Sequence, residues 1–165
     1  SPTGGIPHNH MVRFVNRILQ TMNEILRSVW GYGLEMVYMN TETPMDYKFP
    51  VMIKEGGTIS DCSMCSQGER EILDMAWLFA LCRILHFGRE YPVKLDEPDT
   101  ALSHGNRSRI TDLVAQMVDG GIIQQLFLIN HFHSLFSAFG DADVVCLNTE
   151  NILPPADYNE NVTIE

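Results

Sequence analysis

Basic residues are scarce in this sequence. The 165 residues include 11 Lys and Arg against 21 Asp and Glu, which gives a formal net charge of −10 at pH 7 with histidine neutral. This balance excludes a continuous basic surface that grips nucleic acid by releasing counterions. If DNA is a partner, another part of the assembly must supply much of the positive charge.

Long apolar runs and cysteines are also scarce. No uncharged apolar run approaches the ~20 residues needed to cross a bilayer, and residues 1–10 lack the basic-then-apolar pattern of a signal peptide. Four cysteines do not make a disulfide scaffold, because a chain of this length buries a core that is stable without one. We expect one soluble, intracellular domain with free thiols and no membrane contact.

The sequence lacks a phosphate-cradling loop of the form GxxxxGK[ST]. Its glycine pairs are Gly4-Gly5, Gly56-Gly57 and Gly120-Gly121, and none leads into Lys followed by Ser or Thr. Any nucleotide site in this chain must therefore be incomplete.

The N-terminal part is predicted to be a helix. Residues 1–8 have the composition of a linker or junction. From there, apolar residues alternate at spacings of four and three, which predicts a helix over residues 9–31; they are Met11, Val15, Ile18, Met22, Ile25 and Val29. Two interpretations stay open: an amphipathic helix packed on the domain, or the root of a longer coiled-coil arm.

The remaining pattern alternates strands with helices. It predicts strands at 34–39 and 47–53 in a hairpin or meander, a helix ending near residue 86, a strand before Asp96, a helix over 106–118, a strand at 126–129, a short helix after Phe132 and a strand at 144–147. This order predicts an α/β fold with a mostly parallel sheet, whose ligands bind beyond the carboxyl ends of the strands. The acidic tail, 151–165, reads as loosely ordered.

The segment Ser66-Gln67-Gly68-Glu69 is predicted to begin a helix. Ser66 and Glu69 fit a capping box, in which each side chain binds the other residue's backbone N–H. An exposed helix start also offers free N–H donors and partial positive charge, and a glycine allows close approach, which suits a terminal phosphate. The structural and the functional interpretation are compatible.

Two adjacent carboxylates, Asp96 and Glu97, follow the predicted strand that contains Val93 and Leu95. One of them can hold magnesium, usually through water, while the other orients and deprotonates an attacking water. The alternative is a solvated acidic turn before Pro98.

Histidines follow the next strand. His131 comes after Leu126–Ile129 and is either a hydrogen-bonded structural residue or a sensor of a terminal phosphate, with His133 as a competitor. The pair Cys62-x-x-Cys65 combined with these histidines is a weaker zinc hypothesis, because neither spacing matches a common finger.

The ordered motifs, 65–70, 93–98 and 128–131, resemble the signature loop, Walker B strand and switch histidine of ABC ATPases of the SMC type. Within these, the chain looks most like the second head lobe of the SbcC-like ATPase subunit of the double-strand-break repair nuclease. The resemblance implies a C-terminal lobe over 32–150, whose phosphate-loop lobe lies elsewhere in the same protein across a coiled coil.

The resemblance also implies roles for single residues. Ser66, Gln67, Gly68, Glu69 and Ser103 would contact ATP held by a second head, with Asp96 supporting Mg²⁺, Glu97 as the catalytic base and His131 reading the terminal phosphate. Three positions depart from the family pattern: Gln67 replaces a glycine, Lys94 an apolar residue and Ser103 an aspartate.

The implied function is ATP-driven head dimerisation that controls a metal-dependent nuclease subunit acting on DNA ends. The rivals are an SMC-type DNA clamp without nuclease and a degenerate module that binds ATP without hydrolysis. The location would be the cytoplasm, near the nucleoid, in a prokaryote or virus, and the nucleus in a eukaryote.

Overall fold

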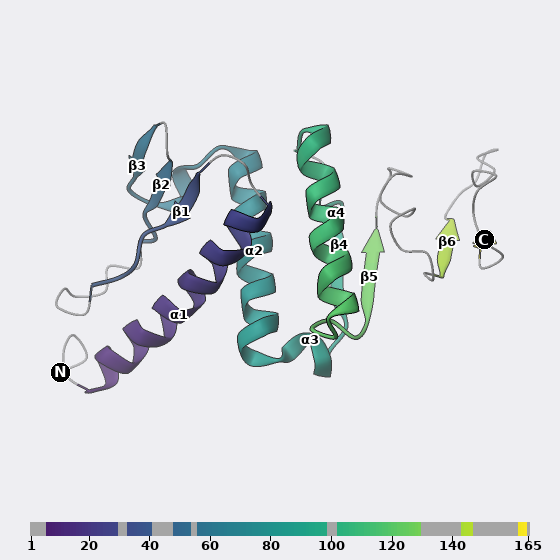
Figure 1. Ribbon diagram of the computed structural model, residues 1–165, viewed down its shortest axis with the longest axis horizontal. Helices are drawn as coiled ribbons and strands as arrows, with labels where there is room; N and C mark the ends of the chain where they lie inside the picture. The colour runs from purple at the N-terminus through teal and green to yellow at the C-terminus, as the bar shows by residue number, and fades with distance from the viewer. Residues whose placement is uncertain are drawn as a thin grey trace.

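The structure, a computed structural model, describes residues 6–29, 33–40, 48–53, 56–98, 102–129, 143–146 and 162–164. Helices and strands mix along the chain, which confirms the α/β class (Figure 1). In order they are α1 (Ile6–Val29), β1 (Leu34–Met36), β2 (Val51–Ile53), β3 (Gly57–Ile59), the 3-10 turn η1 (Cys62–Met64), α2 (Gln67–Leu85), α3 (Phe87–Glu90), β4 (Val93–Asp96), α4 (His104–Asp119), β5 (Leu126–Ile129), β6 (Val144–Cys146) and β7 (Val162–Ile164).

Helix α1 begins at Ile6, earlier than the predicted start at residue 9. Pro7 does not prevent this, because first-turn N–H groups have no acceptor within a helix. The predicted apolar seam is buried from Val15 to Ile25, but Met11 is 55% exposed. Val12, Leu19 and Leu26 are buried instead, so the stripe is wider than a coiled-coil seam and packs on α2 and β1.

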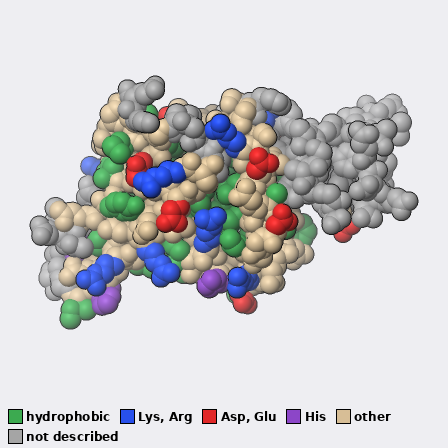
Figure 2. All heavy atoms as spheres, viewed as in Figure 1, with side chains coloured by type: hydrophobic (Ala, Val, Ile, Leu, Met, Phe, Trp, Pro, Cys, Tyr) green, Lys and Arg blue, Asp and Glu red, His purple; other side chains and the backbone are tan. Residues whose placement is uncertain are grey.

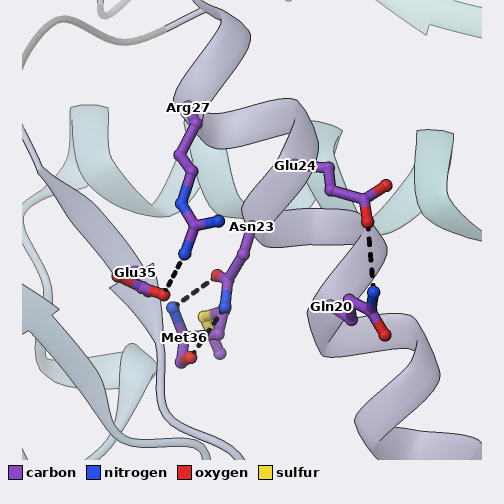
Figure 3. Close-up of polar contacts among 6 residues, drawn as sticks. All are labelled: Gln20, Asn23, Glu24, Arg27, Glu35 and Met36. Atoms are coloured by element: carbon purple, nitrogen blue, oxygen red, sulfur yellow. Dashed lines mark hydrogen bonds and ion pairs between the residues drawn. The ribbon is translucent and has the colours of Figure 1, made fainter.

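Two asparagines on α1 attach the segment around β1 to the helix. Asn23 donates from Nδ2 to the Met36 carbonyl at 3.0 Å, and its Oδ1 accepts the Met36 N–H at 2.8 Å (Figure 3). Asn16 makes the same pair of bonds to Met39, at 2.8 and 2.7 Å. An ion pair from Arg27 to Glu35 adds a contact on the exposed side. Strand β1 is therefore held by helix side chains and not only by its neighbouring strand.

The first sheet is an antiparallel meander in the order β1-β2-β3. This confirms the predicted meander but adds β3, which the sequence pattern missed because its glycines indicated only a closing turn. Gly57 has φ +85, a conformation that favours glycine, and it begins β3 directly opposite Ile53. The predicted second strand is shorter than expected in the described residues, since β2 covers only Val51–Ile53.

Strands β4 and β5 form a parallel pair behind and beside α4 (Figure 1), in the register Val93 to Leu126 and Asp96 to Ile129. One cluster of buried side chains joins α1, β1, α2, β4 and α4. The turn through α3 passes so close to the chain before β5 that a Cβ on Gly88 would lie 2.6 Å from the Ile122 carbonyl oxygen. This close approach requires glycine and positions the start of β4.

A second parallel pair, β6 with β7, joins Val144 to Val162 and Cys146 to Ile164. Strand β7 lies within the tail predicted to be loosely ordered, and all three residues of its run, Val162-Thr163-Ile164, are β-branched, which favours strands. The predicted helix after Phe132 lies outside the described residues. In the described part of the chain, no helix has the length and apolar character of a membrane span.

Candidate functional site

The loop before α2 is built by a 3-10 turn and a helix cap. Ser66 has extended backbone angles, φ −60 and ψ 161, and both bonds of the capping box to Glu69 are present. The Ser66 N–H donates to Glu69 Oε2 at 2.9 Å, and Ser66 Oγ accepts the Glu69 N–H at 3.4 Å. The capping prediction is confirmed, whereas phosphate contact by Ser66 stays a prediction.

The start of α2 is open to an incoming ligand. Ser66 and Gln67 are exposed, while Gly68 and Glu69 are partly exposed. Gln67 donates to Glu71 along the helix surface at 3.2 Å, so its side chain extends away from the first turn. The amides of Gln67 and Gly68 have no acceptor within the helix by its geometry, and they can bind an anion together with the positive end of the helix dipole.

The turn before Ser66 is fixed by Asp61. Asp61 Oδ2 accepts the Ser63 hydroxyl at 2.5 Å, and its Oδ1 accepts the Phe49 N–H at 3.3 Å. These hydrogen bonds, from Ser63 first and then Phe49, lower the pKa of the exposed Asp61 carboxyl. The turn leading to Ser66 is thereby connected to the segment that precedes β2.

The carboxylates after β4 differ from each other in conformation. Asp96 is the last residue of β4, is exposed, and pairs with Lys94 Nζ at 3.0 Å. Glu97 has left-handed φ +47, and its N–H donates to the Ile129 carbonyl at 2.9 Å. Because such a φ is unfavourable for non-glycine residues and recurs at functional sites, it distinguishes Glu97 from an ordinary surface carboxylate.

Sequence reasoning missed two features of this strand end. The Lys94–Asp96 pair follows from i, i+2 spacing, which places both side chains on one face of a strand. No sequence signal indicates the left-handed conformation of Glu97, because the following Pro98 favours an extended backbone. Lys94 is therefore not only an interruption of an apolar strand, because it contacts the carboxylate predicted to support magnesium.

Ser103 is the N-cap residue that precedes α4, and its side chain makes no cap bond, while its carbonyl accepts the N–H groups of Asn106 and Arg107, both at 3.0 Å. Its exposed hydroxyl is thus available to a partner.

His131 and His133 lie outside the described residues, so the sensor role stays a prediction. Within the described ranges, no group of three His, Cys, Asp or Glu could hold a metal, and the zinc hypothesis, which needs His131 and His133, stays a prediction.

The predicted segments lie toward one end of the molecule. In Figure 1 the start of α2, the carboxyl ends of β4 and β5, and the start of α4 all lie toward the top. The parallel register of β4 with β5 fixes the common direction of the two strands. The backbone after Ile129 therefore leaves β5 at the same edge as Asp96 and Glu97, as the prediction for ligand-binding loops requires.

Solved structures similar to this chain are SMC heads. One, from work on ATP-driven dimerization and DNA-stimulated activation of SMC ATPases, matches with a TM-score of 0.61 and 19% identity over 79% of this chain and 77% of its own. Another is the Smc head domain from Pyrococcus furiosus with an extended coiled coil, bound to the C-terminal domain of ScpA. It matches with a TM-score of 0.60 and 20% identity over 82% of this chain and 32% of its own. The chain has the fold of an SMC head.

A further SMC head, bound to the C-winged helix domain of ScpA, matches with a TM-score of 0.57 and 21% identity over 82% of this chain and 39% of its own. This chain thus spans about a third of the length of the longer SMC structures. No protein-family profile matches the sequence, and no curated protein is significantly similar to it. At these identities the likeness establishes the fold, and the roles of single residues rest on the site itself.

Proposed function

We propose that this chain is the second lobe of an SMC-type ATP-hydrolysing head, which is completed by a phosphate-loop lobe of the same protein and dimerises with a second head when ATP binds. The observation that carries the proposal is the combination of an SMC-head fold with signature-like and Walker-B-like segments in a sequence that contains no phosphate loop. Such a chain holds the residues that act on ATP but not the loop that cradles it.

The exposed outer face of the β4–β5 pair supports a second layer of protein that covers the pair in the complete head. Val93, Leu95, Leu126 and Leu128 lie on its inner face, whereas Lys94, Asp96, Phe127 and Ile129 lie in register on the outer face. Phe127 is 53% exposed and Ile129 is 42% exposed. Because parallel sheets are normally covered on both faces, these apolar side chains suit a surface covered by the phosphate-loop lobe.

ATP and Mg²⁺ fit the residues present. The open start of α2 suits the terminal phosphate of a nucleotide held by a second head, with Ser66, Gln67, Gly68 and Glu69 around it. Asp96 offers an exposed carboxylate to a magnesium ion, which would neutralise phosphate charge, although Lys94 competes for one oxygen. Glu97 would orient and deprotonate water, while Ser103 and His131 would contact the nucleotide from α4 and beyond β5.

Two assemblies are compatible with this head. In the first it controls a metal-dependent nuclease subunit in double-strand-break repair. In the second it works in an SMC-type DNA clamp. Two of the similar solved structures, in which an SMC head is bound to a domain of ScpA, favour this second assembly. On the face shown in Figure 2, acidic and basic side chains are interspersed. Because the chain carries a formal net charge of −10 at pH 7, DNA contacts in either assembly would need positive charge from other parts. Co-purification with a nuclease or with a ring-closing subunit distinguishes the two.

The Ser66 side chain allows a direct test in a reconstituted head. Ser66→Asp caps a helix well but removes the bond that the Ser66 hydroxyl donates to Glu69 Oε2 at 2.7 Å and places negative charge against a phosphate, so we expect the loss of ATP-dependent dimerisation to exceed greatly any fall in melting temperature. Ser66→Ala is the matched control, because it costs about 1 kcal/mol of stability through the cap without adding charge. Normal ATP-dependent dimerisation of Ser66→Asp in light scattering would contradict the phosphate contact.

A further inference from the structure

The 3-10 turn before Ser66 brings two cysteines together. Cys62 begins η1, and the Cys65 N–H donates to the Cys62 carbonyl at 3.1 Å. Side chains three residues apart in such a turn eclipse each other. At a rise of about 2 Å per residue their Cα atoms are about 6 Å apart, within the range that disulfides span.

Both side chains lie on the core side of the turn. Cys65 is 5% exposed and belongs to the buried cluster, and Cys62 packs against the same cluster while remaining partly open to solvent. The Cys62 thiol donates a weak hydrogen bond to Asp61 Oδ1 at 3.6 Å. A rotation about χ1 of Cys62 would break this bond and turn the thiol toward Cys65. An oxidant from solvent therefore reacts with Cys62 first, and the buried Cys65 reacts only with the oxidised Cys62.

We propose that Cys62 and Cys65 are a reversible dithiol–disulfide pair that takes a small-molecule disulfide such as oxidised glutathione as its oxidant. The Cys62 thiolate attacks one sulfur of glutathione disulfide, forms a mixed disulfide and releases one glutathione thiolate. The Cys65 thiolate then attacks the Cys62 sulfur and releases the second. Two electrons pass to the glutathione sulfurs, and the two protons lost by the cysteines are taken up by the released thiolates through water.

The bond would restrain the start of α2. Cys65 directly precedes Ser66, so closing the turn fixes the backbone that presents the capping box. The bond itself follows from the turn alone, whereas its effect on nucleotide contact rests on the proposed function. Burial raises the pKa of both thiols, so oxidation is slow at neutral pH and the pair stays reduced unless oxidising conditions persist.

The test is a thiol map of the full chain equilibrated in a glutathione redox buffer, with free thiols then blocked by N-ethylmaleimide. Trypsin cleaves after Lys54 and Arg70, so the peptide 55–70 contains both cysteines, while 71–83 contains the fully buried Cys82 as an internal control. We expect 55–70 to lose two hydrogen atoms and carry no glutathione, and 71–83 to remain reduced. Dithiothreitol should reverse the change.

The variant Cys65→Ser distinguishes a disulfide between Cys62 and Cys65 from glutathionylation of Cys62 alone. Without the Cys65 thiol, the glutathione adduct on Cys62 should be stable. A wild-type chain that keeps the same adduct, or that stays fully reduced in native buffer while it forms the bond in urea, would overturn the proposal. Hydrogen exchange provides the second readout. Amides 66–69 should exchange several-fold more slowly in the oxidised chain, with α4 unchanged, and equal rates would overturn the restraint of Ser66 independently of any ATP measurement.

Discussion

The two asparagines of α1 make the same bonds in different surroundings, which allows their free-energy contributions to be compared. Asn23 is 1% exposed and binds the backbone of Met36, which is 3% exposed. Asn23→Ala leaves one buried N–H and one buried carbonyl unpaired. At about 1 to 3 kcal/mol for each unsatisfied group, we expect the free energy of unfolding to fall by about 2 to 6 kcal/mol.

Asn16→Ala is the matched control. Asn16 and Met39 are only partly buried, so water can replace the lost bonds, and we expect a loss of about 1 kcal/mol. The higher helix propensity of alanine benefits both variants equally. Urea denaturation followed by tryptophan fluorescence measures both values. The reasoning is refuted if Asn16→Ala costs as much as Asn23→Ala, because burial would then not decide the penalty.

Further predictions concern the left-handed residues, the metal ligand and the thiols. Glu97→Gly should raise the thermal stability slightly, since glycine relieves the φ of +47 by about 1 kcal/mol, whereas Glu97→Gln keeps that strain and should gain no stability; both should abolish ATP turnover in a complete head. His86→Gly, at the left-handed C-cap of α2, should stabilise by a similar amount without affecting turnover, as measured by melting and ATPase assays. Asp96→Ala should weaken magnesium-dependent nucleotide binding in calorimetry, while Lys94→Ala should strengthen it. Alkylation of Cys62 should accelerate about tenfold per pH unit from 7 to 9, because burial, the Asp61 carboxylate and, more weakly, Cys65 and Asp74 raise its pKa; a flat profile would contradict this.

Local patterns predicted the site segments well. The Ser66–Glu69 spacing determined a capping box that the structure contains, and alternation at Val93 and Leu95 determined which face of β4 is buried. The bounds of β5 matched the prediction, Leu126–Ile129. These features depend on neighbours within a few residues, where helix and strand periodicity are informative.

Features that depend on distant partners were not predictable. The positions of Asn16 and Asn23, seven residues apart, pointed to one side of α1, but an apolar pattern does not show that a polar residue binds the backbone 13 or 23 positions away. Strands β3 and β7 exist through pairing with β2 and β6, which no local signal specifies. The Glu97 N–H donates to the Ile129 carbonyl, a contact that only the fold supplies.

The open outer face of β4 and β5 has a consequence for when the site can act. The inner face of this parallel pair belongs to the buried cluster, whereas its outer face exposes Phe127 and Ile129, and Asp96 and Glu97 lie at its carboxyl end. In the head proposed above, the phosphate-loop lobe would cover this outer face and complete the surroundings of the two carboxylates. In that proposed head, this chain would turn over ATP only after the phosphate-loop lobe docks, so assembly itself would limit hydrolysis by unassembled halves.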